Sequence, residues 1–143
     1  MRMKLLLAVD GSACSLRAVG HVVAIRQAWR MAPQVHLLNV HPPIPIARAR
    51  QQVGHDNLQR YYREEGEAQL AAAEATLRDA GIDFVRHLHV GDPGEVIVQL
   101  AHELGCDWIV VGNQGRSALA DAVIGSVSRR VLKLASCPVL LVK

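Results

Sequence analysis

The chain has 143 residues, of which 50% are hydrophobic and 20% are charged, and its formal net charge is +3. This length favours one domain with one core, and the composition excludes collagen-like and intrinsically disordered chains. Aromatic residues make up only 3% of the chain and the basic residues are scattered, so we expect no nucleic-acid binding.

The alternation of apolar runs and turn residues predicts five strands that alternate with four helices. The predicted elements are a strand over 4–9, a helix over 13–29, a strand over 35–40, a helix over 58–80, a strand over 82–90, a helix over 93–104, a strand over 107–111, a helix over 127–135 and a strand over 138–142.

Residues at the ends of the predicted helices support these bounds. Ser12 is a good N-cap for the first helix, and Asp92 followed by Pro93 is a dense signal for a helix start. Gly81 and Gly105 are typical residues just beyond a helix end. The segment 41–57 begins with several prolines and predicts a long loop, either a lid or a mobile excursion.

Strict alternation of strand and helix predicts an α/β fold with a doubly wound, open, five-stranded parallel sheet in the order 3-2-1-4-5 and four helices. We expect a single domain over residues 1–143, because no repeat or linker divides the chain. The third strand alternates in polarity more than the others, which favours an edge position.

The cysteines and the N-terminal residues bear on the compartment. Cys14, Cys106 and Cys137 are widely spaced and include no CxxC pair, so we expect neither a disulfide framework nor a zinc site. No apolar run is long enough to span a membrane, and residues 1–9 do not read as a signal peptide. These features favour a cytoplasmic protein that does not bind membranes.

Two polar turns follow neighbouring strands of the predicted sheet. Asp10-Gly11-Ser12 ends the first strand, and Gly112-Asn113-Gln114-Gly115 ends the fourth. In doubly wound sheets ligands bind beyond the carboxyl ends of the strands, where the strand order reverses. Topology alone therefore predicts one crevice bordered by both turns.

The glycines around this crevice favour an anionic ligand. Neither GxGxxG nor GxxxxGK[ST] occurs at these turns, which argues against an NAD-type site and a P-loop. Gly112, Gly115 and Gly125 would let the backbone turn and approach a ligand. The last helix then starts with N–H groups that can bind an anion, those of Ser126, Val127 and Ser128, with Arg116 adding a positive charge nearby.

The spacing G-x2-G-x9-G-[ST] from Gly112 to Ser126 resembles the nucleotide-binding signature of the universal stress proteins. The stretches LLLAVDGS, GDPGEVIVQLAHELGCDWIVVG and GSVSRRVLKLASCPVLLVK are also similar to that family. The resemblance implies a Rossmann-like fold of the adenine nucleotide alpha hydrolase type. It also implies that the protein binds ATP with Mg²⁺. It implies that the nucleotide contacts Ala8, Val9, Asp10, Val40, Gly112, Gly115, Arg116, Ser117, Gly125, Ser126, Val127 and Ser128.

The chain departs from the family pattern between the first two glycines. A small hydroxyl residue and a basic residue are usual there, and this chain has Asn113 and Gln114. Both side chains form hydrogen bonds but neither is charged, so phosphate affinity or nucleotide preference can differ.

Four further residues have both a functional and a structural interpretation. For Asp10 we favour ligand binding over capping of the first helix, for which Ser12 is better placed. For the pair His87 and His89 we favour a solvated strand face over a metal site, since zinc needs three or four ligands. Cys14 near the crevice is expected to be a small buried thiol and not a redox sensor.

The function expected first is a nucleotide-dependent regulatory or stress-response protein. A slow ATPase or self-phosphorylating enzyme is the second possibility, although the sequence shows no strong general base for water at the glycine loop, where Asp10 and Asp121 are the carboxylates considered. A nucleotide-free, chaperone-like interaction module is the third. The apolar strand 138–142 lies at a predicted sheet edge, so we expect a homodimer that pairs Pro138–Val142 with its copy.

Overall fold

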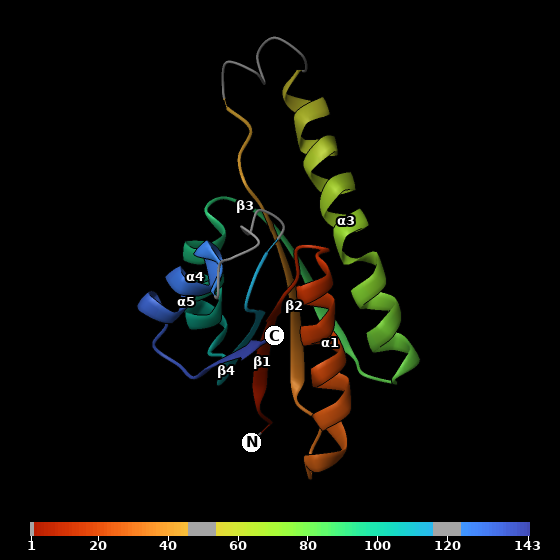
Figure 1. Ribbon diagram of the computed structural model, residues 1–143. Coiled ribbons are helices and arrows are strands. Elements are labelled where there is room, and N and C mark those ends of the chain that lie inside the picture. The colour runs from red at the N-terminus through yellow and green to blue at the C-terminus, as the bar shows by residue number, and fades with distance from the viewer. Residues whose placement is uncertain (1, 46–53, 116–123) are drawn as a thin grey trace.

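The computed structural model describes residues 2–45, 54–115 and 124–143, in which a twisted parallel sheet lies between two layers of helices (Figure 1). The elements are β1 (Lys4–Ala8), α1 (Ala13–Ile25), the 3₁₀ helix η1 (Arg26–Ala28), β2 (Gln34–His41), α3 (His55–Asp79), β3 (Phe84–Val90), α4 (Pro93–Leu104), β4 (Trp108–Gly112), α5 (Ser126–Leu134) and β5 (Val139–Val142).

The strand order is β3-β2-β1-β4-β5 and all neighbouring strands are parallel, as the sequence predicted. The register places Leu5 beside both Val35 of β2 and Trp108 of β4. β1 and β4 are therefore neighbours at the point where the strand order reverses. β3 and β5 form the two edges of the sheet, which confirms the edge position predicted for the third strand.

Two apolar clusters hold the layers together, one on each face of the sheet. α1 and α3 cover one face, and α4 and α5 cover the other (Figure 1). Successive residues of β1 alternate between the two clusters, with Leu5 and Leu7 on the α1 and α3 side and Leu6 on the other. Because β1 is covered on both faces, these three leucines are at most 1% exposed, which explains why the strand reads as a continuous apolar run.

Several predicted bounds differ from the observed ones by a few residues. The α-helical part of the first helix ends at Ile25, and η1 replaces its expected last turn up to Trp29. α3 begins at His55 and not at 58, since Gly54 takes the extended N-cap conformation and Asp56 supplies an acid in the first turn. The loop expected over 41–57 is correspondingly shorter, and its residues 46–53 lie outside the described residues.

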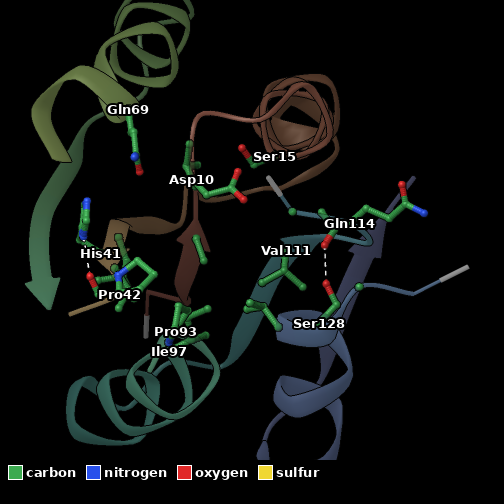
Figure 2. Close-up of a pocket in the computed structure, with 18 of the residues that line it drawn as sticks. Asp10, Ser15, His41, Pro42, Gln69, Pro93, Ile97, Val111, Gln114 and Ser128 are labelled. Carbon is green, nitrogen blue, oxygen red and sulfur yellow. Dashed lines mark hydrogen bonds between the residues drawn. The ribbon is translucent and has the colours of Figure 1, made fainter. Parts of the chain in front are cut away.

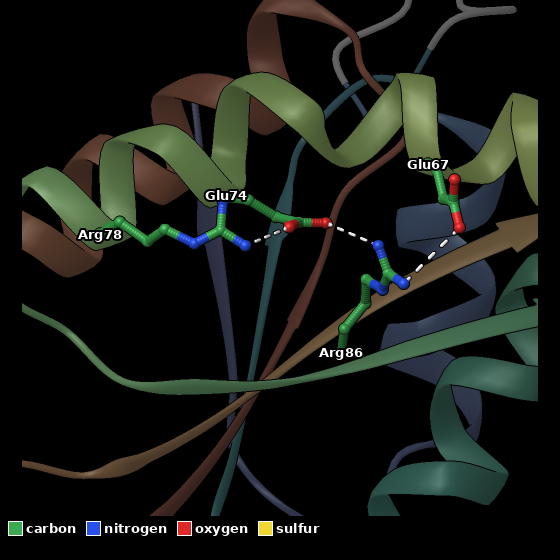
Figure 3. A network of polar contacts seen from close by, with 4 residues as sticks. All are labelled: Glu67, Glu74, Arg78 and Arg86. Atoms are coloured by element: carbon green, nitrogen blue, oxygen red, sulfur yellow. Dashed lines mark hydrogen bonds and ion pairs between the residues drawn. The ribbon is translucent and has the colours of Figure 1, made fainter.

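A polar network ties α3 to the edge strand β3 (Figure 3). Glu74 is only 7% exposed, and its carboxylate accepts from Arg78 at 2.9 Å and from Arg86 of β3 at 3.5 Å. Arg86 also pairs with Glu67 at 3.6 Å. A long polar helix is thereby held over β2 and β3, and this placement decides which of its residues reach the ligand crevice.

None of the helices in the described parts of the chain is both long and apolar enough to cross a membrane.

Candidate functional site

A cavity of about 310 Å³ opens at the carboxyl ends of β1, β2 and β4, within the size range of roughly 300 to 1,000 Å³ typical of small-molecule sites. Of the twelve residues predicted from the sequence, Arg116 and Ser117 lie outside the described residues. The other ten all line this cavity: Ala8, Val9, Asp10, Val40, Gly112, Gly115, Gly125, Ser126, Val127 and Ser128.

The Asp10 turn serves both the first helix and the cavity. Asp10 Oδ1 accepts a hydrogen bond from the Ser12 backbone N–H at 2.9 Å, and Gly11 turns the chain with a φ of +83°. Ser12 is the N-cap of α1, where its Oγ accepts from the Ser15 N–H at 3.2 Å. The capping role thus belongs to Ser12, and the carboxylate of Asp10 faces the cavity (Figure 2).

The start of α5 forms the opposite wall. Gly125, not Ser126, is the N-cap, and its side-chain-free backbone offers no capping oxygen. The first helical hydrogen bond runs from the Arg129 N–H to the Gly125 carbonyl at 3.0 Å. The N–H groups of Ser126, Val127 and Ser128 precede that bond, so the helix itself gives them no acceptor. They lie at the positive end of the helix dipole, which favours an anion.

The hydroxyl of Ser128 has a structural partner. Its Oγ–H donates to the Gly112 carbonyl at 2.6 Å, and the residue is 3% exposed. This bond fastens α5 to the end of β4, visible as the dashed line in Figure 2. Ser128 can therefore donate its backbone N–H to a ligand, while its hydroxyl proton stays in the hydrogen bond to the Gly112 carbonyl of β4.

The three signature glycines are required by close packing and not by their φ angles. None of them has a φ in the left-handed region, unlike Gly11. A Cβ on Gly112 would lie 2.9 Å from the Cys14 carbonyl carbon, and one on Gly115 would lie 2.9 Å from Asp10 Oδ2. A Cβ on Gly125 would lie 3.2 Å from the Gln114 Cα. The signature thus lets the β4 turn approach α1, the Asp10 carboxylate and the start of α5.

The two residues that depart from the family pattern face different surroundings. Gln114 lines the cavity, whereas Asn113 is not among its lining residues. Asn113 Oδ1 accepts from the thiol of Cys14 at 3.0 Å, and its carbonyl accepts from the Gly125 N–H at 2.6 Å. Cys14 is 6% exposed and is a small buried thiol, as the sequence predicted. Gln114 alone of the two is placed to influence a ligand.

The sequence missed the part of the cavity that α3 supplies. Glu65 and Gln69, one helical turn apart, line it, and so do His41 and Pro42 at the end of β2. α3 is polar along most of its length, so nothing in its sequence distinguishes these two positions. Pro93 and Ile97 of α4 were also missed, although their i,i+4 spacing on a helix that starts beside the crevice is a usable signal.

The charge of the cavity wall is negative where the structure describes it. The charged residues among the described lining are Asp10 and Glu65, both acidic. The helix terminus of α5 supplies the compensating positive potential at one end only.

A pair of histidines lies away from the cavity, on the face of β2 and β3 that bears α4. His36 is 5% exposed, and its Nδ1 lies 2.9 Å from Nε2 of the half-buried His87. Burial first, and then the neighbouring histidine, lowers the pKa of His36, while burial and His89 lower the pKa of His87. No group of three or more metal-ligating side chains occurs in the parts of the chain described here.

The family model of the universal stress protein family matches residues 1–143, and the chain belongs to this family. The universal stress protein MJ0531 of Methanocaldococcus jannaschii is 30% identical over 140 residues, which covers 98% of this chain and 81% of that protein. The solved structure of the protein MJ0577 has a TM-score of 0.83 and 30% identity, and the match covers 100% of this chain and 96% of that one.

A second solved structure contains a ligand. The crystal structure of a universal stress protein in complex with cAMP has a TM-score of 0.71 and 26% identity, over 99% of this chain and 97% of that one.

Proposed function

We propose that this protein binds ATP with Mg²⁺ in the cavity at the carboxyl ends of β1, β2 and β4, and acts as a nucleotide-dependent regulatory protein in a stress response. The observation that carries the proposal is the convergence on one cavity of ten predicted residues from four separate segments. Their spacing in the sequence resembles a nucleotide-binding signature, and a similar universal stress protein has been solved with cAMP.

The two ends of the cavity differ in the chemistry they offer a nucleotide. Figure 2 shows His41, Pro42 and Gln69 at one end, Gln114 and Ser128 at the other, and Asp10 between them. The apolar side chains Val9, Leu38 and Val40 also line the cavity and suit a flat base. The start of α5 suits the phosphates. A carboxylate at the end of the first strands, here Asp10, is where nucleotide folds hold the ribose.

The donor set also fits Mg²⁺ that arrives with the nucleotide. Mg²⁺ commonly binds one or two carboxylates together with substrate phosphates and water. Asp10 can supply one such carboxylate, and the described residues include no cluster that would hold the ion without the nucleotide. The ion would neutralise part of the phosphate charge near Asp10 and Glu65.

Thermal unfolding with and without ligand tests this proposal. At an ATP concentration 100 times the Kd, mass action stabilises the folded state by about 2.7 kcal/mol, so the melting temperature should rise by several degrees. Gly115→Val should abolish the rise, because the new side chain occupies the space between the β4 turn and Asp10.

The matched control is Gly20→Val. A Cβ at Gly20 meets no atom within 4 Å, and the residue lies on the exposed face of α1. This variant should keep the full rise with ATP. A wild-type protein that shows no rise at millimolar ATP with Mg²⁺ would refute the proposal.

We also propose that two copies associate through Pro138–Val142. β5 is the terminal strand on its side of the sheet, and its four residues are all only partly buried. Such an apolar edge has N–H and C=O groups directed away from the sheet, which a two-fold copy can pair. Association of this kind would give nucleotide binding a route to affect a partner surface, since Gly112 and Val142 are neighbours in register.

A further inference from the structure

Gln69 is held in one orientation by a buried amide of β2. Asn39 is 1% exposed, and its Nδ2 donates to the Val9 carbonyl at 2.9 Å and to Gln69 Oε1 at 2.7 Å. A carbonyl oxygen can only accept, so the atom of Asn39 that faces Val9 must be the NH₂ group. The hydrogen-bond partners therefore decide which terminal atom of Asn39 and of Gln69 is the oxygen and which is the nitrogen.

This assignment fixes what Gln69 offers the cavity. Both hydrogens of the Asn39 NH₂ group are used, and the second is accepted by the Gln69 oxygen. The NH₂ group of Gln69 is then left as a donor, and within the described residues it has no hydrogen-bond partner. Figure 2 shows the side chain reaching from α3 into the cavity between Asp10 and His41. At Gln69 itself, a ligand meets a donor and not an acceptor.

We propose that Gln69 reads the base of the bound nucleotide, with its amide N–H donating to a ring nitrogen of adenine. The inference rests on the proposed binding of ATP and adds the residue that selects the base. Adenine ring nitrogens are acceptors. Gln69 and the apolar Leu38 and Val40 line the same cavity, and Leu38 and Val40 flank Asn39 on β2. The carboxylate of Asp10 suits the ribose hydroxyls, and the N–H groups at the start of α5 suit the phosphates.

The substitution Gln69→Glu tests the donor without removing the contact that holds it. One carboxylate oxygen can still accept from Asn39, while the other presents an acceptor to the cavity where the wild type has a donor. Because a charge change alters the affinity for every nucleotide, the readout is a ratio: the Kd for a deaza analogue of ATP divided by the Kd for ATP. Gln59→Glu makes the same change on an exposed position of α3 and is the control.

Titration calorimetry with 1-deaza-, 3-deaza- and 7-deaza-ATP, each with Mg²⁺, gives the ratios. The wild type and Gln59→Glu should bind one of the three analogues about tenfold more weakly than ATP, the effect of one lost hydrogen bond. In Gln69→Glu that ratio should fall to one or below, since a carboxylate prefers the C–H of the analogue to a ring nitrogen.

Equal binding of all three analogues by the wild type would overturn the role of Gln69, and so would a tenfold ratio that persists in Gln69→Glu. Loss of discrimination against 2′-deoxy-ATP alone would assign Gln69 to the ribose and would equally overturn it. If the wild type binds ATP in these titrations, each of these three results counts against Gln69 only, whereas absence of ATP binding refutes the proposed function itself.

Discussion

Gly112 offers a sharp test of why the signature glycines are needed. The substitution Gly112→Ala adds one methyl group at the end of β4, where it would lie 2.9 Å from the Cys14 carbonyl carbon and 3.0 Å from the carbonyl oxygen and Sγ. Carbon atoms in contact are normally about 3.5 to 4.0 Å apart. To restore a normal contact distance, either β4 or the first turn of α1 must therefore move by roughly half an ångström or more.

Neither partner can yield easily. Cys14 lies in the first turn of α1, whose start is fixed by the Ser12 cap and by Asp10. Gly112 is paired with Val142 of β5, and its carbonyl accepts from the hydroxyl of Ser128. Overpacking of this kind costs about 1 to 3 kcal/mol. For a chain of this size that corresponds to a fall in melting temperature of about 4 to 12 °C.

Urea unfolding followed by circular dichroism, without nucleotide, measures this loss directly. Gly20→Ala is the matched control, because the same methyl group meets no atom within 4 Å there and should raise stability by about 0.5 to 1 kcal/mol. Gly115→Ala should cost less than Gly112→Ala, because the close neighbour of its Cβ among the described residues is a side-chain oxygen, Oδ2 of Asp10, and not backbone. A Gly112→Ala protein as stable as the wild type would refute a packing role for this glycine.

Three further predictions follow from the edge strand, the acidic cavity wall and the histidine pair. Leu141→Lys should shift a dimer to monomer in sedimentation velocity, because pairing of β5 would bury the unpaired charge; a concentration-independent wild-type monomer contradicts this. Steady-state phosphate release should be far below the roughly 1 to 100 per second of kinases, and a rate in that range that Asp10→Asn abolishes would make the protein an enzyme. Burial lowers the pKa of His36 and His87, so near and below pH 6.5 the unfolded chain binds more protons than the folded protein. The free energy of unfolding should therefore fall as the pH drops from about 7. The fall is at most about 1.4 kcal/mol per pH unit for each histidine. His36→Leu should flatten that slope in urea titrations at pH 5 to 8, and an unchanged slope would show that other groups cause it.

Local patterns in the sequence were enough to predict the order of elements and the position of the cavity. The apolar run at Leu5–Leu7 indicated a strand buried on both faces, and Asp92 with Pro93 indicated a helix start. A helix start and a strand buried on both faces are each encoded by residues that lie close together in the sequence. The rule that ligands bind where the strand order reverses then joined Asp10 to Gly112 without any knowledge of their contacts.

Only the tertiary structure decided which residues of α3 meet the ligand crevice, and what the glycines do there. Gln69 reaches the cavity because the buried Leu70 and Leu77, helped by the pairing of Glu74 with Arg86, pack α3 across β2 and β3. Its donor faces inward because Asn39, thirty residues earlier, bonds the Val9 carbonyl. No local pattern indicated the contact between Gly112 and Cys14. Contacts across 98 residues depend on how helices cross a sheet, and no local periodicity encodes that geometry.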